Sequence, residues 1–157
     1  MSTKLYFKRE DEDDTTRISI GGVIDEQADF KDVFSKLNSN VVIDMDTVEM
    51  INSCGVREWL QATKEIPKST DVQYENCPPR IVEQINYIAN FLGHGEVISF
   101  YAPYYCPKEK KDVNILLTPK DIKIKDIPEA PKKKCPDCKS PLEFEDIEEE
   151  YFSFLQN

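Results

Sequence analysis

VVIDMDTVEMINSCGVREWLQAT, residues 41–63, is the stretch that decides the fold. It opens with the run Val41-Val42-Ile43, which is unbroken and β-branched, as is typical of a strand buried on both faces. Four later residues are spaced i, i+3, i+4 and i+7 and so share one face of an amphipathic helix: Val56, Trp59, Leu60 and Thr63. The stretch is therefore predicted to be a buried strand that leads into a helix.

The residues before this stretch predict a hairpin and another helix. Residues 4–8 are apolar at their centre and residues 15–20 alternate apolar with polar side chains, so two strands are expected around an acidic turn at 9–14. Gly21-Gly22 is expected to break or bulge the second strand. A helix is then predicted from a second i, i+3, i+4, i+7 pattern: Phe30, Val33, Phe34 and Leu37.

The residues after this stretch continue the alternation of strands and helices. A strand is predicted at 71–76, a third helix with a wide apolar face at 81–92, and a last strand at 96–101. Gly93 is expected to stop the third helix. Strands that alternate with helices imply parallel pairing in a layered α/β domain, with an antiparallel piece from the opening hairpin.

Charge and cysteine usage narrow the class of protein. The formal net charge of −10 argues against general DNA binding, which depends on clustered Lys and Arg. No apolar run reaches the roughly 18 residues that a membrane span needs, and the N-terminal residues lack the apolar stretch of a secretory signal. Because the five cysteines are odd in number and no signal is present, we expect a cytoplasmic, reduced protein without a membrane partner.

The loop between the predicted buried strand and its helix has two interpretations. Backbone N–H groups at the start of a helix point outward and stabilise an anion or a phosphorylated hydroxyl. Alternatively, Ser53 is an N-cap of the helix, and Gly55 permits close packing.

Three segments together resemble the STAS family, whose bacterial members are anti-sigma factor antagonists: Gly22-Val23-Ile24-Asp25, Val41-Val42-Ile43-Asp44-Met45 and Ile51-Asn52-Ser53-Cys54-Gly55-Val56. The resemblance covers about residues 3–104 and includes the order of the elements. It implies an α/β fold with a STAS-like mixed sheet and helices packed on it. In that family the loop usually reads Asp-Ser-Ser-Gly or Asp-Ser-Thr-Gly, and a partner kinase phosphorylates the second hydroxyl, which releases the partner.

The resemblance also implies a partner surface on the loop and the helix that follows. A regulatory protein, either a kinase or an anti-sigma-like factor, is expected to dock there, on a set of seven residues: Asn52, Ser53, Cys54, Gly55, Arg57, Glu58 and Gln61.

Two residues depart from the family pattern. Asn52 stands where the acid is usual, and Cys54 stands where the phosphorylated Ser or Thr is usual. Three possibilities remain open. The chain is a binder that is never phosphorylated, or the switch has moved to Ser53, or Cys54 is a thiol switch whose pKa is lowered by the helix N-terminus.

The last third of the chain differs from the rest and is predicted to be a separate segment, residues 105–157, after a STAS-like domain at 1–104. Residues 106–139 carry ten basic and six acidic groups, a net charge of +4. Cys135 and Cys138 have the spacing of half a zinc ribbon, and Cys106 lies upstream with Glu109 where a second Cys would stand. The segment therefore predicts a small β-rich, zinc-ribbon-like appendix.

Two interpretations of the appendix remain open. It binds zinc through Cys106, Glu109, Cys135 and Cys138, although three sulfurs and one oxygen are an uncommon structural set. Alternatively, it is a degenerate ribbon without metal, and its aromatic side chains hold it against the first domain: Phe144, Tyr151, Phe152 and Phe154.

The residues favour a binding protein over an enzyme. The chain has one histidine, no Gly-rich phosphate loop and no paired nucleophile and base, so we expect no catalytic activity. An alternative function is binding of nucleic acid or the transcription machinery through the ribbon and the lysines from Lys108 to Lys139. Lysines without interleaved aromatic residues make a poor nucleic-acid surface, so a protein partner is favoured.

Overall fold

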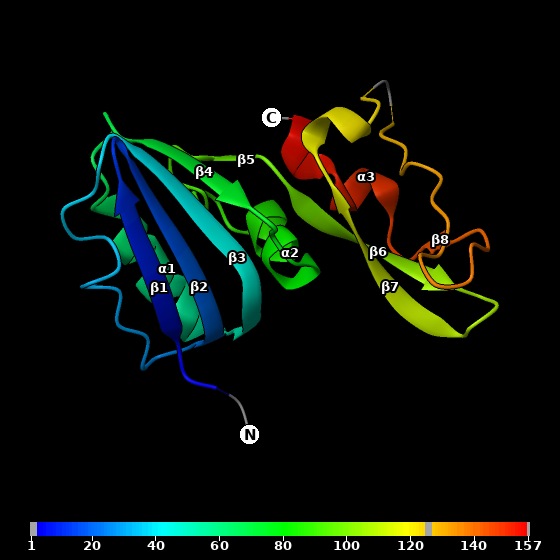
Figure 1. The fold of residues 1–157 in the computed structure, drawn as a ribbon, viewed down its shortest axis with the longest axis horizontal. Coiled ribbons are helices and arrows are strands. Elements are labelled where there is room, and N and C mark those ends of the chain that lie inside the picture. Colours follow the sequence, from blue (N-terminus) through cyan, green and yellow to red (C-terminus); the bar gives the residue numbers. More distant parts are fainter. Residues whose placement is uncertain (1–2, 125–126, 157) are drawn as a thin grey trace.

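The fold, a computed structural model that describes residues 3–124 and 127–156, contains two sheets (Figure 1). Five strands form the first sheet, in the spatial order of their numbering: β1 (Tyr6–Glu12), β2 (Thr15–Ile24), β3 (Asn40–Ile51), β4 (Asp71–Glu75) and β5 (Glu96–Val97). β1 is antiparallel to β2, and the later pairs are parallel. The predicted α/β class, with a mixed sheet and an opening hairpin, is confirmed.

Helix α1 (Ser53–Lys64) covers one face of this sheet, as Figure 1 shows. Its Trp59 side chain is fully buried among four aromatic rings, those of Phe30, Phe34, Tyr74 and Phe91. The Trp59 indole Nε1 donates a hydrogen bond to the Phe91 carbonyl oxygen, at 2.9 Å. Burial of the large ring together with its polar N–H therefore fixes the helix on the sheet.

The N-terminal end of α1 approaches the carboxyl end of β2 very closely at Gly55. A Cβ atom at this position would lie 1.9 Å from the Ile24 carbonyl oxygen, well inside van der Waals contact. Only glycine therefore permits this approach of helix to strand. The predicted β-bulge is also present, because the pairing of β2 with β3 shifts register between Ser19 and Gly21 and again after Gly22.

The C-terminal segment forms a second, three-stranded antiparallel sheet, so the predicted β-rich appendix is confirmed. Its elements are β6 (Phe100–Cys106), β7 (Lys111–Leu117), the short 3-10 turn η1 (Pro119–Asp121), β8 (Glu143–Phe144), α3 (Glu148–Tyr151) and η2 (Ser153–Gln156). The two sheets share one continuous hydrophobic core. None of the helices within residues 3–124 and 127–156 is long and apolar enough to span a membrane.

The end of the chain packs back against the first part of the molecule. The rings of Phe152 and Phe154 contact Phe100 edge-on, with centroids 6.1 and 5.2 Å away. Asn86, on α2 (Pro79–Tyr87), donates to the Tyr151 carbonyl and accepts hydrogen bonds from the Ser153 hydroxyl and the Phe154 backbone N–H. One amide side chain thus ties the C-terminal turns to α2.

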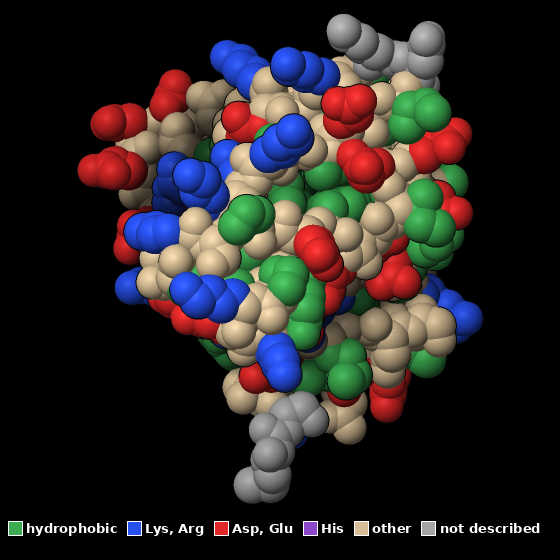
Figure 2. All heavy atoms as spheres, turned by 90° about the vertical axis from the view of Figure 1, so that its right-hand side faces the viewer, with side chains coloured by type: hydrophobic (Ala, Val, Ile, Leu, Met, Phe, Trp, Pro, Cys, Tyr) green, Lys and Arg blue, Asp and Glu red, His purple; other side chains and the backbone are tan. Residues whose placement is uncertain are grey.

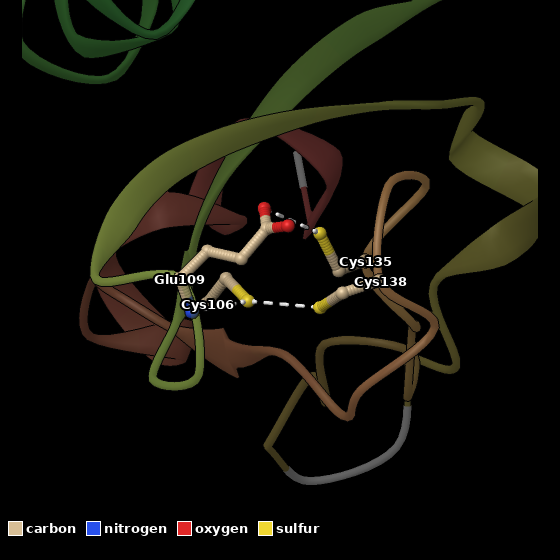
Figure 3. Close-up of side chains that lie close together, drawn as sticks. All are labelled: Cys106, Glu109, Cys135 and Cys138. Atoms are coloured by element: carbon tan, nitrogen blue, oxygen red, sulfur yellow. Dashed lines mark hydrogen bonds between the residues drawn. The ribbon is translucent and has the colours of Figure 1, made fainter.

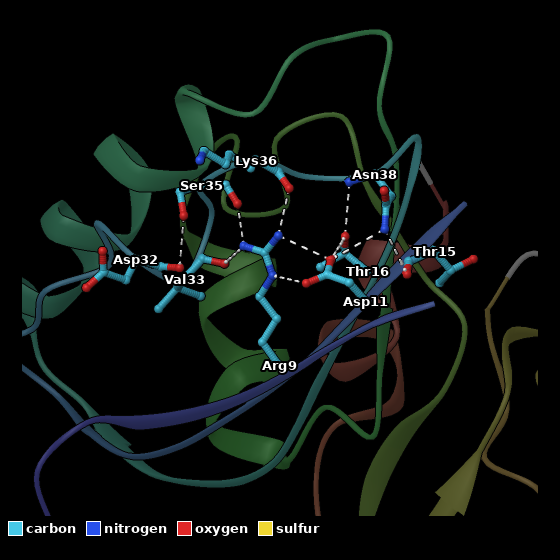
Figure 4. Close-up of polar contacts among 9 residues, drawn as sticks. All are labelled: Arg9, Asp11, Thr15, Thr16, Asp32, Val33, Ser35, Lys36 and Asn38. Carbon is cyan, nitrogen blue, oxygen red and sulfur yellow. Dashed lines mark hydrogen bonds and ion pairs between the residues drawn. The ribbon is translucent and has the colours of Figure 1, made fainter. Parts of the chain in front are cut away.

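The helix predicted from Phe30 to Leu37 is wrong, and the reason lies in β1. This segment makes a single turn, and Lys36 then adopts a positive φ of 49°. The Arg9 guanidinium donates to the carbonyl oxygens of Val33, at 3.3 Å, and Lys36, at 2.7 Å, and also to that of Ser35 (Figure 4). Of these three carbonyls only that of Val33 would have a partner inside a helix that ended at Leu37, so a side chain from a distant strand holds the segment as a loop by binding all three.

Three other boundaries also differ from the sequence predictions. β1 continues to Glu12, so the turn of the hairpin is Asp13-Asp14 rather than all of 9–14. α2 ends at Tyr87, because Ile88 takes extended backbone with φ −106° and ψ 116°, and the carbonyls of residues 91 and 92 accept hydrogen bonds from the side chains of Trp59 and Tyr74. The strand expected at 96–101 is divided between β5 and β6. The predicted boundary after residue 104 falls within β6, and the division into two domains stays a prediction.

Replacing Arg9 with Met is expected to lower the free energy of unfolding by about 1–3 kcal/mol, because the part-buried Val33 carbonyl and two exposed carbonyls of the same segment lose their charged donor. Urea unfolding followed by the fluorescence of Trp59, which packs on Phe34, measures this loss. The matched control is Arg17→Met. Arg17 makes an exposed ion pair with Glu75, so about 1 kcal/mol or less should be lost. Equal losses in the two variants would contradict the role of Arg9.

Replacing Gly55 with Ala is expected to cost about 1–3 kcal/mol of unfolding free energy, because the added methyl group collides with the Ile24 carbonyl. Ser53→Ala is the control. Ser53 is exposed in the same turn, and its change should stay within about 0.5 kcal/mol. A Gly55→Ala protein as stable as the control in thermal unfolding would show that the contact relaxes without cost.

Candidate functional sites

The first candidate site is the loop from β3 into α1, which Asn52 holds in place. The Asn52 side-chain oxygen accepts a hydrogen bond from the Gly55 backbone N–H at 2.7 Å, and the Asn52 N–H donates to the Ile24 carbonyl at 3.1 Å. Asn52 is therefore the N-cap, and the prediction that Ser53 has this role is wrong by one residue. Ser53 already has helical geometry, so its side chain is free of that task.

Glu26 belongs to this site and was not predicted from the sequence. The Asn52 side-chain Nδ2 donates to the Glu26 carboxylate at 3.2 Å. Glu26 has a lowered pKa, because its own backbone N–H and then the Asn52 amide bind the charged carboxylate. An Asp at position 52 would place a second negative charge beside Glu26, whereas the neutral amide donates to it.

The residues predicted to bind a partner lie together on the surface. Ser53, Cys54, Arg57 and Gln61 are exposed and Glu58 is partly exposed, while Gly55 is buried beneath them. On one side this surface borders a groove of about 640 Å³ between α1 and the segment at 28–34. Phe30 and Phe34 line the groove together with Glu58, Gln61 and Lys64. The face offers polar contacts around a partly apolar hollow.

The second candidate site is a cluster of three thiols and one carboxylate in the C-terminal sheet. Cys106 ends β6, Glu109 lies in the turn to β7, and Cys135 and Cys138 lie in a separate turn. The four ligand atoms all lie within 4.8 Å of one another, and Figure 3 shows them pointing toward a common centre. The Sγ atoms of Cys106 and Cys138 are 3.5 Å apart. These four residues could therefore hold a metal ion.

The two turns that carry the cluster have the same local structure. Each pairs its two donor residues at i and i+3, and each is followed by a Lys with positive φ, 53° at Lys110 and 63° at Lys139. In the first turn the Glu109 backbone N–H donates to the Cys106 sulfur at 3.4 Å. Glu109 thus occupies the position in its turn that Cys138 occupies in the other.

The thiols have environments that a cation would stabilise. Hydrogen bonds from the side chain and backbone of Ser140 lower the pKa of Cys138 to about 7. The Glu109 N–H favours the Cys106 thiolate, yet burial and the two neighbouring thiols outweigh it and raise the Cys106 pKa. The neighbouring sulfurs therefore oppose ionisation of Cys106 but favour that of Cys138, and a bound metal ion would stabilise both thiolates.

Two charged residues at the rim of the cluster were missed by the sequence analysis. The Lys111 ammonium group lies 2.9 Å from Glu109 Oε2 and also pairs with Asp137, which stands between the two cysteines of the second turn. The pKa of Lys111 is raised by these carboxylates, that of Asp137 first. The pairing joins residues 26 positions apart, so no spacing in the sequence indicates it.

The two remaining cysteines lie outside this cluster and differ from each other. Cys54 is exposed at the start of α1. Cys77 is fully buried, and burial raises the pKa of its thiol to about 12. Cys77 is therefore an apolar core residue at neutral pH.

No protein-family model matches the chain, and no curated protein matches it. Among solved structures, the chain is similar to the crystal structure of an anti-sigma factor antagonist from Mycobacterium paratuberculosis. The two are 22% identical, with a TM-score of 0.49, and the similarity covers 61% of this chain and 90% of that chain. Function is therefore argued from the geometry of the two sites and from the resemblance in the sequence.

Proposed function

We propose that this chain is a regulatory module that acts by binding a protein partner and not by catalysis. The partner docks on the loop and the exposed face of α1, on Asn52, Ser53, Cys54, Gly55, Arg57, Glu58 and Gln61. The observation that carries this proposal is the pairing of a fixed loop with an exposed helix face, at the place where the sequence resembles the partner surface of STAS proteins.

The rigidity of the loop supports this role. Asn52 makes hydrogen bonds to Gly55 on α1 and to Ile24 and Glu26, which lie at the end of β2 and just after it. Gly55 meets the Ile24 carbonyl, so the first turn of α1 has little room to move. A surface that is ordered before binding loses little conformational entropy when the partner docks.

The usual phosphorylation switch does not operate at position 54 in this proposal. A thiol is not an ordinary kinase substrate, and Cys54 stands where the phosphorylated hydroxyl is usual. The partner is a regulatory protein of the kinase or anti-sigma-like class, and its binding is continuous unless another group near the loop is modified. Ser53, which is exposed, is the remaining hydroxyl of the loop.

Charge and composition disfavour nucleic acid as the partner. Figure 2 shows that most Lys and Arg side chains on the C-terminal end of the molecule lie in the left half of that view, with acidic side chains among them. Residues 107–139 contain ten lysines but no aromatic residue that could stack on a base. Two of the acids, Glu109 and Asp137, pair with Lys111 and so reduce the local positive charge.

Docking on this surface predicts that charge changes on α1 reduce partner capture. The chain, used as bait in lysate of its own cell under reducing conditions, should capture a regulatory protein, identified by quantitative mass spectrometry. Arg57→Glu and Cys54→Asp are each expected to lower its recovery about tenfold. An acid near the start of a helix is favourable, so Cys54→Asp should fold normally.

Arg80→Glu is the matched control, because Arg80 is exposed near the start of α2 and the charge change is the same. Recovery with this variant should equal that of the wild type. If Arg57→Glu and Cys54→Asp each recover as much of the regulatory protein as the wild type does, the docking surface is refuted. Recovery of nucleic-acid-bound machinery alone, lost at raised salt, would favour the alternative function.

We also propose that the metal ion of the second site is zinc. Thiolates are soft ligands that select zinc over hard cations, and two turns with the i, i+3 spacing are the usual carriers of a tetrahedral structural zinc. Carboxylate oxygen is an accepted fourth ligand. The ion would join the β6–β7 turn to the turn at 135–138 and so stabilise a sheet whose β8 has only two residues.

The zinc proposal predicts about one zinc ion per chain after purification under reducing conditions, measured by plasma mass spectrometry. Cys135→Ser and Cys138→Ser should each lose the ion. Cys54→Ser is the matched control, because Cys54 is exposed outside the cluster, and it should retain zinc fully. Zinc content that is absent in the wild type, or equal in all three variants, would contradict the site.

A further inference from the structure

We propose that Glu109 is an exchangeable ligand of the bound metal, and that a neutral imidazole nitrogen can take its place. This inference rests on the zinc site proposed above. It divides that site into three fixed thiolates and one replaceable oxygen, so that the ion can accept a donor from outside the chain.

The first argument is the difference in exposure between the ligands. Cys106 and Cys135 are fully buried and Cys138 is partly exposed, whereas the Glu109 side chain is 32% exposed at the tip of the β6–β7 turn. Glu109 has the place of a cysteine in a turn that otherwise matches the second one. Two of the sulfurs are therefore buried, whereas the longer carboxylate side chain reaches the cluster from a partly solvated turn.

The second argument is competition for a single oxygen. Glu109 Oε2 lies 2.9 Å from the Lys111 ammonium nitrogen and 3.8 Å from Cys135 Sγ. The Lys111 ammonium group and a metal ion in the thiol cluster would therefore compete for the same oxygen atom of Glu109. Lys111 is held at this point by Asp137, which belongs to the opposite turn. A carboxylate that leaves the metal therefore already has a fixed cation to pair with.

The third argument is the charge of the donor set. Three thiolates already surround the metal, and the carboxylate adds a further negative charge at the same centre. An imidazole donates a lone pair without charge, and three sulfurs with one imidazole are a common zinc set. In the exchange, the metal–oxygen bond to Glu109 breaks and a metal–nitrogen bond forms. The carboxylate keeps its electron pair and binds Lys111, and no proton is transferred.

The test uses the full chain with cobalt(II) in the site, because the visible ligand-field bands of cobalt report its donor atoms. Addition of imidazole to the wild type should shift these bands in a saturable way. Glu109→Gln removes the competing anion, so imidazole should bind about tenfold more tightly. Glu109→Cys makes a fourth thiolate, and its bands should not respond to imidazole.

Lys111 is a positioning residue in this proposal, and it has its own readout. Lys111→Gln leaves the carboxylate to the metal alone, so imidazole should bind about tenfold more weakly than to the wild type. Lys111→Arg should restore the wild-type response. Lys108→Gln is the matched control, with the same loss of charge in the same turn, and its response should equal that of the wild type.

Two failures are distinguishable. If cobalt and zinc do not bind stoichiometrically, both the zinc site and the exchange are refuted. If cobalt binds but imidazole leaves the wild-type bands unchanged, or if Glu109→Cys responds as strongly as the wild type, the exchange alone is refuted. Trp59 fluorescence, which reports the distant first sheet, checks that each variant remains folded.

Discussion

The contact between Gly55 and the Ile24 carbonyl is the constraint on which the proposed partner surface depends. It seats the first turn of α1 on the end of β2, and the Asn52 N–H binds the same carbonyl oxygen. Because that end of the helix is fixed, Trp59 one turn later enters the aromatic cluster on the sheet. The opposite face of α1 then necessarily points to solvent. Packing on the inside thus determines which residues are available to a partner outside.

The second site depends on a different kind of constraint. β8 has only two residues, and the turn at 135–138 contains no long strand or helix of its own. Aromatic packing of Phe144 on Tyr104 and Phe152 supports one side of the small sheet. The thiol cluster lies at the other end, between the two turns, where few apolar side chains are present to join them. A metal ion there would supply the cross-link that the core does not.

Sequence reasoning succeeded where structure is set by local spacing and failed where it is set by distant side chains. An unbroken β-branched run located β3, the helical period located α1, and the i, i+3 spacing indicated the same four residues that cluster in space. The segment from Phe30 to Leu37 has an equally good helical period, but the Arg9 side chain on β1 donates hydrogen bonds to its backbone carbonyl oxygens, and the segment forms a loop. A hydrogen bond across more than twenty residues leaves no periodic signal. The pairing of Lys111 with Asp137 escaped prediction for the same reason.

Both sites contain a residue that departs from the expected motif, and in both a nearby charge accounts for it. Asn52 stands where the STAS loops that this segment resembles usually have an acid, and its amide donates to the Glu26 carboxylate, which a second acid would repel. Glu109 stands where a zinc ribbon would have its fourth cysteine, and its carboxylate binds Lys111, which a thiol would pair with less strongly. Each of these two residue differences alters the charge and preserves the backbone geometry. Asn52 still caps α1, and Glu109 still lies at position i+3 of its turn. Both departures are therefore coupled to charged neighbours that lie outside the motif itself.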